Sequence, residues 1–324
     1  NLQVPAKQSD SDLVPLFTRL CSQLSSQLLE LPKHIASLGQ KAAFHSLNLI
    51  FSYLTSVYSH LPENNKKTFL SIYQSHMKQF TSFSKLATQI HLNSSNQNIA
   101  HHNLNLLYES YKKYNDSDEK LNTSNLGECI DLYILNSSFS KALYHRTQFY
   151  KHHLINCEGM AASIGSLCSL ELKEACKHKD LLLQHIDLLD QNKESLKFIE
   201  KTLKQSNLLY QTRLGSVFKQ ANNLNNYDYH LIYSPHLFDD LSFKKAKSLL
   251  TTLWSKLAPN GKLILTTTQQ QNPNLLFLSF TDHFKTTGYS QNEMFDLAAQ
   301  LSGYRNMHLE LDPFNVFQYL TLCK

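Results

Sequence analysis

The segment from Asn225 to Thr268 constrains the fold more than any other part of this sequence. Its first part, Asp228 to Tyr233, is a short apolar run typical of a strand. The part from Ser242 to Leu257 repeats apolar residues at the spacing of one helix face, and Lys262 to Thr268 is again rich in strand-forming residues. Strand, helix and strand in this order predict one βαβ unit, which requires a parallel sheet and a right-handed crossover.

The loop Ser234 to Asp240 follows the first strand of this unit directly. In open parallel sheets, ligands bind outside the carboxyl ends of the strands. The loop is therefore a candidate edge of an active site. Before the second strand, Pro259-Asn260-Gly261 predicts a turn.

Strand-like and helical patterns alternate on both sides of this unit. We expect earlier strands ending near Gly165, Asp190 and Leu214, with helices between them. A closing pair of strands, Asn306 to Leu311 and Asn315 to Leu322, is joined by a short turn. This pattern predicts an α/β fold with seven strands, the last of them antiparallel.

The first half of the chain has apolar stripes at helical spacing, separated by polar loops. It predicts an all-α, antiparallel helical bundle whose aromatic stripes are core rather than a ligand site. We place the domain boundary near residue 140. Residues 1–140 would be a lid, substrate or interaction domain, and residues 141–324 the α/β domain.

Charge and cysteine content narrow the class of protein. The net charge of +5 over 324 residues forms no basic arm, so it does not argue for a nucleic-acid partner. Six scattered cysteines without CxxC spacing suggest reduced thiols in a cytoplasmic protein. No apolar run reaches the roughly 18 residues of a membrane span, and no signal peptide is apparent. The pairs His101-His102 and His152-His153 lack metal-site spacing, so we expect no metal.

Two features indicate a nucleoside cofactor. The run Ser163-Ile164-Gly165-Ser166 lies between a predicted strand and a predicted helix. A glycine there lets the backbone approach a ligand, and a helix N-terminus offers free N–H groups. Asp190 ends the next strand, near the roughly 20-residue interval at which a carboxylate reaches ribose hydroxyls. Asp190 could instead cap a helix, and the spacing alone leaves both roles open.

The order of elements, Asp190 and the strand end Tyr233-Ser234 resemble the class I S-adenosylmethionine-dependent methyltransferase fold. A closer resemblance is to a bacterial group linked with making 3-hydroxypalmitate methyl ester, an extracellular signalling lipid. Its members have segments similar to Leu231–Leu241, Ser163–Glu171 and Leu189-Asp190-Gln191. The resemblance covers about residues 126–324. It implies a Rossmann-like methyltransferase sheet, S-adenosylmethionine as cofactor, and a small acid, an acyl compound or a protein side chain as methyl acceptor.

The resemblance also implies a set of cofactor-binding residues: Ser163, Gly165, Ser166, Glu171, Asp190, Gln191, Gly215, Ser216, Tyr233 and Ser234. The adenine ring would lie at Gly215-Ser216, after the third strand. Glu171 could equally complement a helix dipole. Two positions depart from the family pattern, since Leu167 replaces a second glycine and Ser163 a common acidic residue. A leucine at position 167 would narrow the pocket for the methionine part of the cofactor. The alternative to an enzyme is therefore an inactive methyltransferase-fold protein that binds a partner through the helical bundle.

His236, Asp239 and Tyr233 are the candidate catalytic residues. Methyl transfer depends mainly on positioning, and only a hydroxyl or amine acceptor needs a strong base. His236 could be a base, a hydrogen-bond donor or a plain surface histidine. Asp239 could orient a substrate or cap the helix that starts near Ser242. We expect Tyr233 to pack beside the cofactor and Arg146 to meet either an anionic substrate or solvent.

Overall fold

The computed structural model describes residues 10–94, 100–117, 123–270, 272, 276 and 288–324. By their contacts, the described residues form two compact units. The first holds those within 1–95, 114–137 and 273–285, and the second those within 96–113, 138–272 and 286–324. The boundary expected at residue 140 stays a prediction, because compactness does not test whether each part folds by itself.

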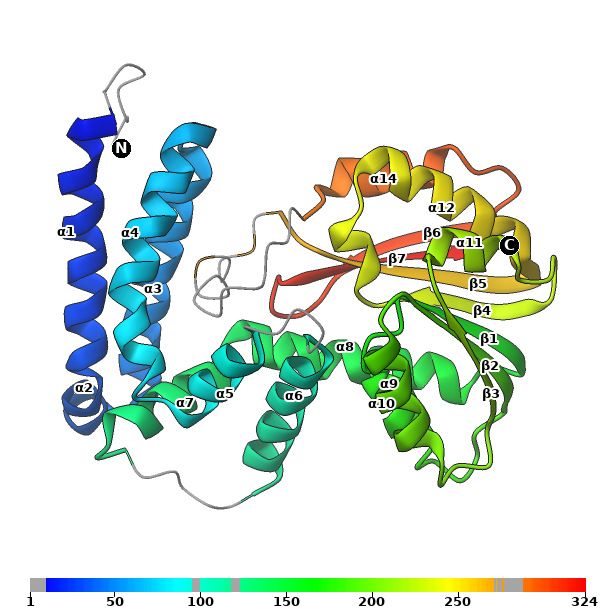
Figure 1. Cartoon of the computed structure of the whole chain (residues 1–324), viewed down its shortest axis with the longest axis horizontal. Coiled ribbons are helices and arrows are strands. Elements are labelled where there is room, and N and C mark those ends of the chain that lie inside the picture. The colour runs from blue at the N-terminus through cyan, green and yellow to red at the C-terminus, as the bar shows by residue number, and fades with distance from the viewer. Residues whose placement is uncertain (1–9, 95–99, 118–122, 271, 273–275, 277–287) are drawn as a thin grey trace. The chain divides into compact units, whose positions relative to one another are not determined.

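The first unit is helical. Its helices are α1 (Asp10–Leu29), α2 (Leu31–Leu38), α3 (Gln40–His60), α4 (Glu63–Thr81), α5 (Lys85–Ser94) and α7 (Leu126–Asn136). Helix α1 lies beside α3 and α4 (Figure 1), and the Phe17 and Phe69 rings meet edge to face at 5.1 Å between centroids. The aromatic stripes of the sequence are therefore packed core. The half-buried Asp131 carboxylate accepts hydrogen bonds from the Ser84 hydroxyl and the Leu86 N–H, which ties α7 to the start of α5.

The second unit contains one seven-stranded sheet. Its strands are β1 (Gly159–Ile164), β2 (Leu183–Asp190), β3 (Leu209–Leu214), β4 (Tyr229–Ser234), β5 (Leu257–Thr268), β6 (Asn306–Leu311) and β7 (Phe317–Cys323). Their order is β3-β2-β1-β4-β5-β7-β6, and β7 runs antiparallel to both of its neighbours. The predicted fold is confirmed: a Rossmann-like methyltransferase sheet with an antiparallel last strand, preceded by helices.

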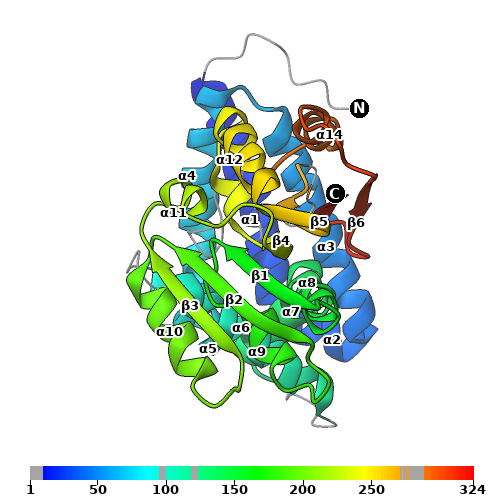
Figure 2. The same ribbon diagram turned by 90° about the vertical axis from the view of Figure 1, so that its right-hand side faces the viewer.

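Helices cover both faces of this sheet (Figures 1 and 2). One face carries α8 (Ser138–Ile155), α9 (Leu170–Ala175) and α10 (Lys193–Leu203). The other carries α11 (Val217–Asn222), α12 (Phe243–Lys256) and α14 (Gln291–Ala299). Strands buried on both faces need apolar side chains in both directions, which explains the continuous apolar runs of β1 and β4.

The turn expected at Pro259-Asn260-Gly261 lies inside strand β5 instead of before it. Tyr229 pairs with Leu257 and Leu231 with Lys262, so the register shifts between the two pairs. Extra residues in one strand are taken up by a bulge, and the positive φ of 65° at Asn260 fits such a bend. The turn residues therefore bend the strand without ending it.

All six cysteines are free, four of them buried and two half-buried. None of the helices described here is long and apolar enough to cross a membrane. Over the same residues, no group of three or more His, Cys, Asp or Glu side chains could hold a metal ion.

Helix α10 offers a test of local stability. The Asn192 side-chain oxygen accepts the N–H groups of Glu194 (2.9 Å) and Ser195 (3.2 Å), two donors that lack a partner within the helix. We expect Asn192→Ala to lower the free energy of unfolding by about 1 kcal/mol, and Asn192→Ser to retain most of the wild-type value. Denaturant unfolding followed by circular dichroism measures both. Equal stability of the alanine and serine variants would contradict this role.

Candidate functional site

Asp190 fixes three loops at the carboxyl edge of the sheet. Its Oδ2 accepts the Leu167 N–H at 2.8 Å, and its Oδ1 accepts the Asn192 N–H at 2.8 Å. Its carbonyl accepts the Gly215 N–H at 3.0 Å, so the loops after β1, β2 and β3 all bind one residue. Burial raises the pKa of this carboxyl group. A third backbone N–H, that of Gln191, also acts on the carboxylate, so about one of the four acceptor positions of a carboxylate remains for a ligand.

The loop after β1 is tightly built. Gly165 has φ +69°, and an added Cβ would lie 2.8 Å from the Leu237 Cβ, so a side chain at this position would be strained and crowded. The packing of Leu237 against this position explains why residue 165 is a glycine. Ser166 is buried, and its hydroxyl donates to the Ser163 carbonyl at 3.1 Å. Leu167 has φ 46°, a left-handed conformation that costs a non-glycine residue about 1–2 kcal/mol.

Glu171 and Tyr233 form a buried hydrogen-bonded pair. The Tyr233 hydroxyl donates to Glu171 Oε1 at 3.0 Å, and the Tyr150 ring lies 5.1 Å from the Tyr233 ring. Tyr150 in turn bonds the Thr266 hydroxyl at 2.6 Å and donates to the Ser234 carbonyl at 3.3 Å. Burial raises the pKa of Glu171 to about 7. Glu171 is therefore no ordinary surface carboxylate at a helix start, since it can hold a proton near neutral pH.

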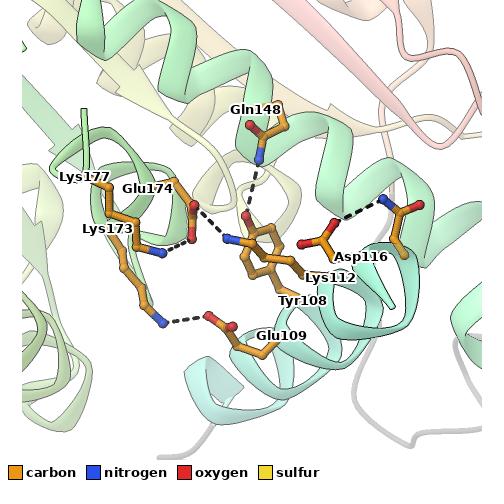
Figure 3. Close-up of polar contacts among 9 residues, drawn as sticks. Tyr108, Glu109, Lys112, Asp116, Gln148, Lys173, Glu174 and Lys177 are labelled. Atoms are coloured by element: carbon orange, nitrogen blue, oxygen red, sulfur yellow. Dashed lines mark hydrogen bonds and ion pairs between the residues drawn. The ribbon is translucent and has the colours of Figure 1, made fainter. Parts of the chain in front are cut away.

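Ion pairs join α9, the helix that carries Glu171, to a neighbouring helix (Figure 3). Lys173 pairs with Glu109 at 2.6 Å, and Glu174 pairs with Lys112 at 3.0 Å. Glu109 and Lys112 belong to α6 (Ala100–Asp116), whose residues within 96–113 lie in the same unit as the sheet. The sequence placed this helix in the bundle. Its contacts with α9 instead make it a support of the site.

Arg146 is buried next to His236. Arg146 is 3% exposed, and its Nη2 donates to the His236 ring, 3.2 Å from Nδ1. The guanidinium also lies over the Phe317 ring, 4.2 Å from its centroid. Burial and the Arg146 charge hold the pKa of His236 well below its usual range. His236 is thus a neutral acceptor and a weak base. The surface position considered for Arg146 is wrong, whereas His236 is half-buried.

Asp239 joins the loop after β4 to the end of β5. Its carboxylate accepts the Thr268 N–H at 2.6 Å and the Thr268 hydroxyl at 3.0 Å. Ser242 precedes α12, and no side-chain capping bond is made there. The helix-cap role expected of Asp239 stays a prediction. Burial raises the pKa of Asp239 to about 6.

A narrow hollow lies between these groups, and it leaves no space for a water molecule. Its lining includes Arg146, Thr147, Tyr150, Glu171, Pro235 and His236. Of the predicted site residues, Glu171 and His236 meet here, and Tyr233 and Ser234 contact its wall through hydrogen bonds. Gln191 is exposed, and Ser216 begins α11 without a side-chain capping bond.

The contribution of α8 was missed by the sequence analysis. Arg146, Thr147 and Tyr150 line the hollow together with Leu143. Residues 143, 146, 147 and 150 recur at the spacing of a single helix face. That spacing was the available signal, but it looked like an ordinary core stripe.

Comparison with known proteins gives the fold. No family model and no curated protein sequence matches this chain. Among solved structures, a possible exported protein from Bordetella parapertussis is similar over 100% of this chain and 99% of its own, with 12% identity and a TM-score of 0.59. At this identity the likeness shows a shared fold, and it extends over both units.

Methyltransferase structures match part of the chain. A SAM-dependent methyltransferase from Archaeoglobus fulgidus has a TM-score of 0.43 and 13% identity, covering 57% of this chain and 94% of its own. The N-methyltransferase NodS from Bradyrhizobium japonicum WM9, in complex with S-adenosyl-L-homocysteine, has a TM-score of 0.41 and 9% identity, covering 67% and 98%. Scores below 0.5 do not bear on function, which must come from the residues of the site.

The pKa of Glu171 gives a test by pH. The pKa rises from 4.5 to about 7 on folding, so the folded state binds this proton more tightly than the unfolded state. Its stabilisation is complete at low pH and is lost as the pH rises through about 7. Glu171→Gln cannot titrate. We expect the free energy of unfolding of the wild type, relative to this variant, to fall by about 3 kcal/mol between about pH 4 and pH 8. Denaturant unfolding across this range measures the difference, and parallel pH curves would contradict the assignment.

Proposed function

We propose that this chain is an S-adenosylmethionine-dependent methyltransferase. The observation that carries the proposal is the position of Asp190. Its carboxylate ends β2, binds the loop after β1 and keeps about one acceptor position, at the sheet edge where ligands bind. The residues present fit the ribose end of such a cofactor.

The other cofactor contacts follow from the loops that Asp190 fixes. Gly215-Ser216 would lie beside the adenine ring, and the loop from Gly165 to Leu167 beside the methionine part. When bound, the cofactor supplies a methyl group on a sulfonium sulfur. The chain's own residues then have to position the acceptor and exclude water.

The acceptor that we propose is a small acid or acyl compound, as in the 3-hydroxypalmitate methyl ester group, with a protein side chain as the other class. The neutral His236 favours the acid. Because its pKa is low, it is a poor base for a hydroxyl or amine acceptor, whereas a carboxylate acceptor needs none.

A second candidate is an inactive methyltransferase-fold protein that binds a partner through its N-terminal helices. Leu167 favours it, since this side chain occupies a left-handed position where the family has a glycine. The packing of Leu237 beside Gly165, where an added Cβ would lie 2.8 Å from the Leu237 Cβ, also favours the inactive protein. The two candidates differ in whether the edge of the sheet binds the cofactor.

Asp190 tests the cofactor site. We expect S-adenosylhomocysteine to bind the wild type in isothermal titration calorimetry, and Asp190→Ala to weaken that binding by about 1.5–3 kcal/mol, the value of a hydrogen bond to a charged group. The matched control is Asp180→Ala, an exposed acid just before β2, which should leave binding unchanged. Circular dichroism checks that both variants remain folded. Absence of binding to the wild type at millimolar ligand would exclude the enzyme and favour the second candidate.

Leu167 tests whether the altered loop takes part in binding. Leu167→Gly removes both the side chain and the left-handed strain of about 1–2 kcal/mol, so it should tighten S-adenosylhomocysteine binding. Leu167→Ala removes bulk and keeps the strained Cβ. An intermediate affinity for the alanine variant would divide the effect between strain and bulk. Equal affinities of all three proteins would place the loop outside the cofactor site.

A further inference from the structure

A cavity of about 460 Å³ lies at the edge of the sheet opposite to Asp190. Its lining comes from the end of α8, the residue before β1, the start of β4 and the bulge of β5, all within the second unit. Parallel strands begin at one edge of a sheet and end at the other, so this cavity is separate from the proposed cofactor contacts. Its volume falls in the range of about 300–1,000 Å³ that is typical of small-molecule sites.

Two imidazoles are held in the wall of this cavity. Gly159 has φ +122°, and a Cβ added there would lie 2.7 Å from His230 Nδ1, so the glycine makes room for the His230 ring. The Met160 N–H donates to His230 Nδ1 in a long hydrogen bond of 3.5 Å. A neutral imidazole that accepts at one nitrogen donates at the other, which makes His230 Nε2 a donor. The His153 ring meets the Phe149 ring edge to face, 4.8 Å between centroids.

Lys262 gives the cavity a positive charge. Its side chain lines the cavity, and among the described residues its ammonium group forms no ion pair. Burial lowers the pKa of His153 to about 4, and the charges of Lys262 and His152 lower it further. Burial raises the pKa of the Cys157 thiol to about 11, against the effect of Lys262. The Lys262 charge therefore acts on two other residues of the lining.

The acid in the lining does not balance this charge. Glu158 is exposed, and the charged groups that shift the pKa of His153 are Lys262 and His152. At the bulge of β5, the Asn260 side-chain oxygen accepts a hydrogen bond from the Arg305 guanidinium, which leaves the amide N–H groups of Asn260 as donors. A cavity with donors and an unpaired ammonium group defines a site for an anion.

We propose that this cavity binds the phosphate group of a small phosphorylated molecule, with Lys262 as its counter-ion and His153 and His230 as hydrogen-bond donors. Lysine binds phosphate as a point charge, whereas planar carboxylates are matched by the fork of an arginine, a residue type that does not occur in this lining. The donors come from three elements, α8, β4 and β5, which suits a group with several acceptor oxygens. Leu231 and Cys157 offer apolar surface to the organic part.

Glycerol 3-phosphate is the probe, with glycerol as its uncharged match and propionate as a singly charged carboxylate. We expect glycerol 3-phosphate to bind the wild type in isothermal titration calorimetry and to raise its thermal unfolding midpoint in a saturable way. Glycerol and propionate should do neither. Lys262→Met should weaken binding by about tenfold, because it removes a hydrogen bond to a charged group. Its unfolding midpoint without ligand should equal that of the wild type, since Lys262 is exposed.

Lys244→Met is the matched control. Lys244 is an exposed lysine on α12, so this variant lowers the net charge by the same amount and should keep the wild-type affinity. His230→Phe keeps a flat ring without its nitrogens and should weaken binding by about three- to tenfold, the effect of one neutral hydrogen bond.

Four results would count against the site or its ligand. Equal affinities of the wild type and Lys262→Met would overturn the site, as would an equal loss in Lys244→Met or no binding to the wild type. Equal affinity for propionate would overturn the phosphate assignment. Inorganic phosphate should bind more weakly than glycerol 3-phosphate, because it leaves the apolar surface uncovered. Equal affinity for the two would overturn the organic part and leave the free ion as ligand.

Titration with S-adenosylhomocysteine separates this site from the proposed function. Lys262→Met should bind S-adenosylhomocysteine as the wild type does, and Asp190→Ala should bind glycerol 3-phosphate as the wild type does, because the two residues lie at opposite edges of the sheet. Either ligand can then fail to bind without affecting the conclusion drawn from the other.

Discussion

The edge of this sheet depends on hydrogen bonds to one residue, Asp190. Its two carboxylate oxygens and its carbonyl bind the loops after β1, β2 and β3. Parallel strands bring their carboxyl ends to one edge, but the loops that follow are held only by what they bond to. Asp190, which a cofactor at this edge would contact, is therefore also the residue that holds the surrounding loops in position.

The ionisable groups around Arg146 form the second centre of the site, and their charges do not balance. Four ionisable side chains line the hollow, and burial drives three of them toward neutrality. It raises the pKa of Tyr150, raises that of Glu171 to about 7 and lowers that of His236 far below its usual range. Only Arg146 keeps its charge. An arrangement of ionisable groups with shifted pKa values is common at functional sites. It also accounts for the position of α8, which brings Arg146 over the end of the sheet before the first strand begins.

Much of the fold could be predicted from local patterns. The strand from Tyr229 to Ser234 lies where the apolar pattern put it, because a strand buried in such a sheet needs apolar residues. The strand from Asn306 to Leu311 also lies where expected, although it is at the sheet edge and none of its residues is buried. The predicted boundaries of the elements were wrong where a long-range contact overrides a local sequence signal. The turn signal at Asn260 became a bulge inside β5, because pairing with β4 continues past it. The short elements α11 and η1 (Leu237–Asp240) were missed, since one or two turns leave no periodicity to detect.

The sequence alone determined the class of sheet, its antiparallel closing strand and the residues at its strand ends, because apolar periodicity and turn chemistry act over a few residues. It placed Gly165, Asp190 and Tyr233 at one edge. Tertiary structure alone decided what these residues touch. It paired Glu171 with Tyr233, turned Asp239 toward Thr268 and buried Arg146 beside His236. Burial and partners set the charge of an ionisable group, and both depend on residues far apart in the chain.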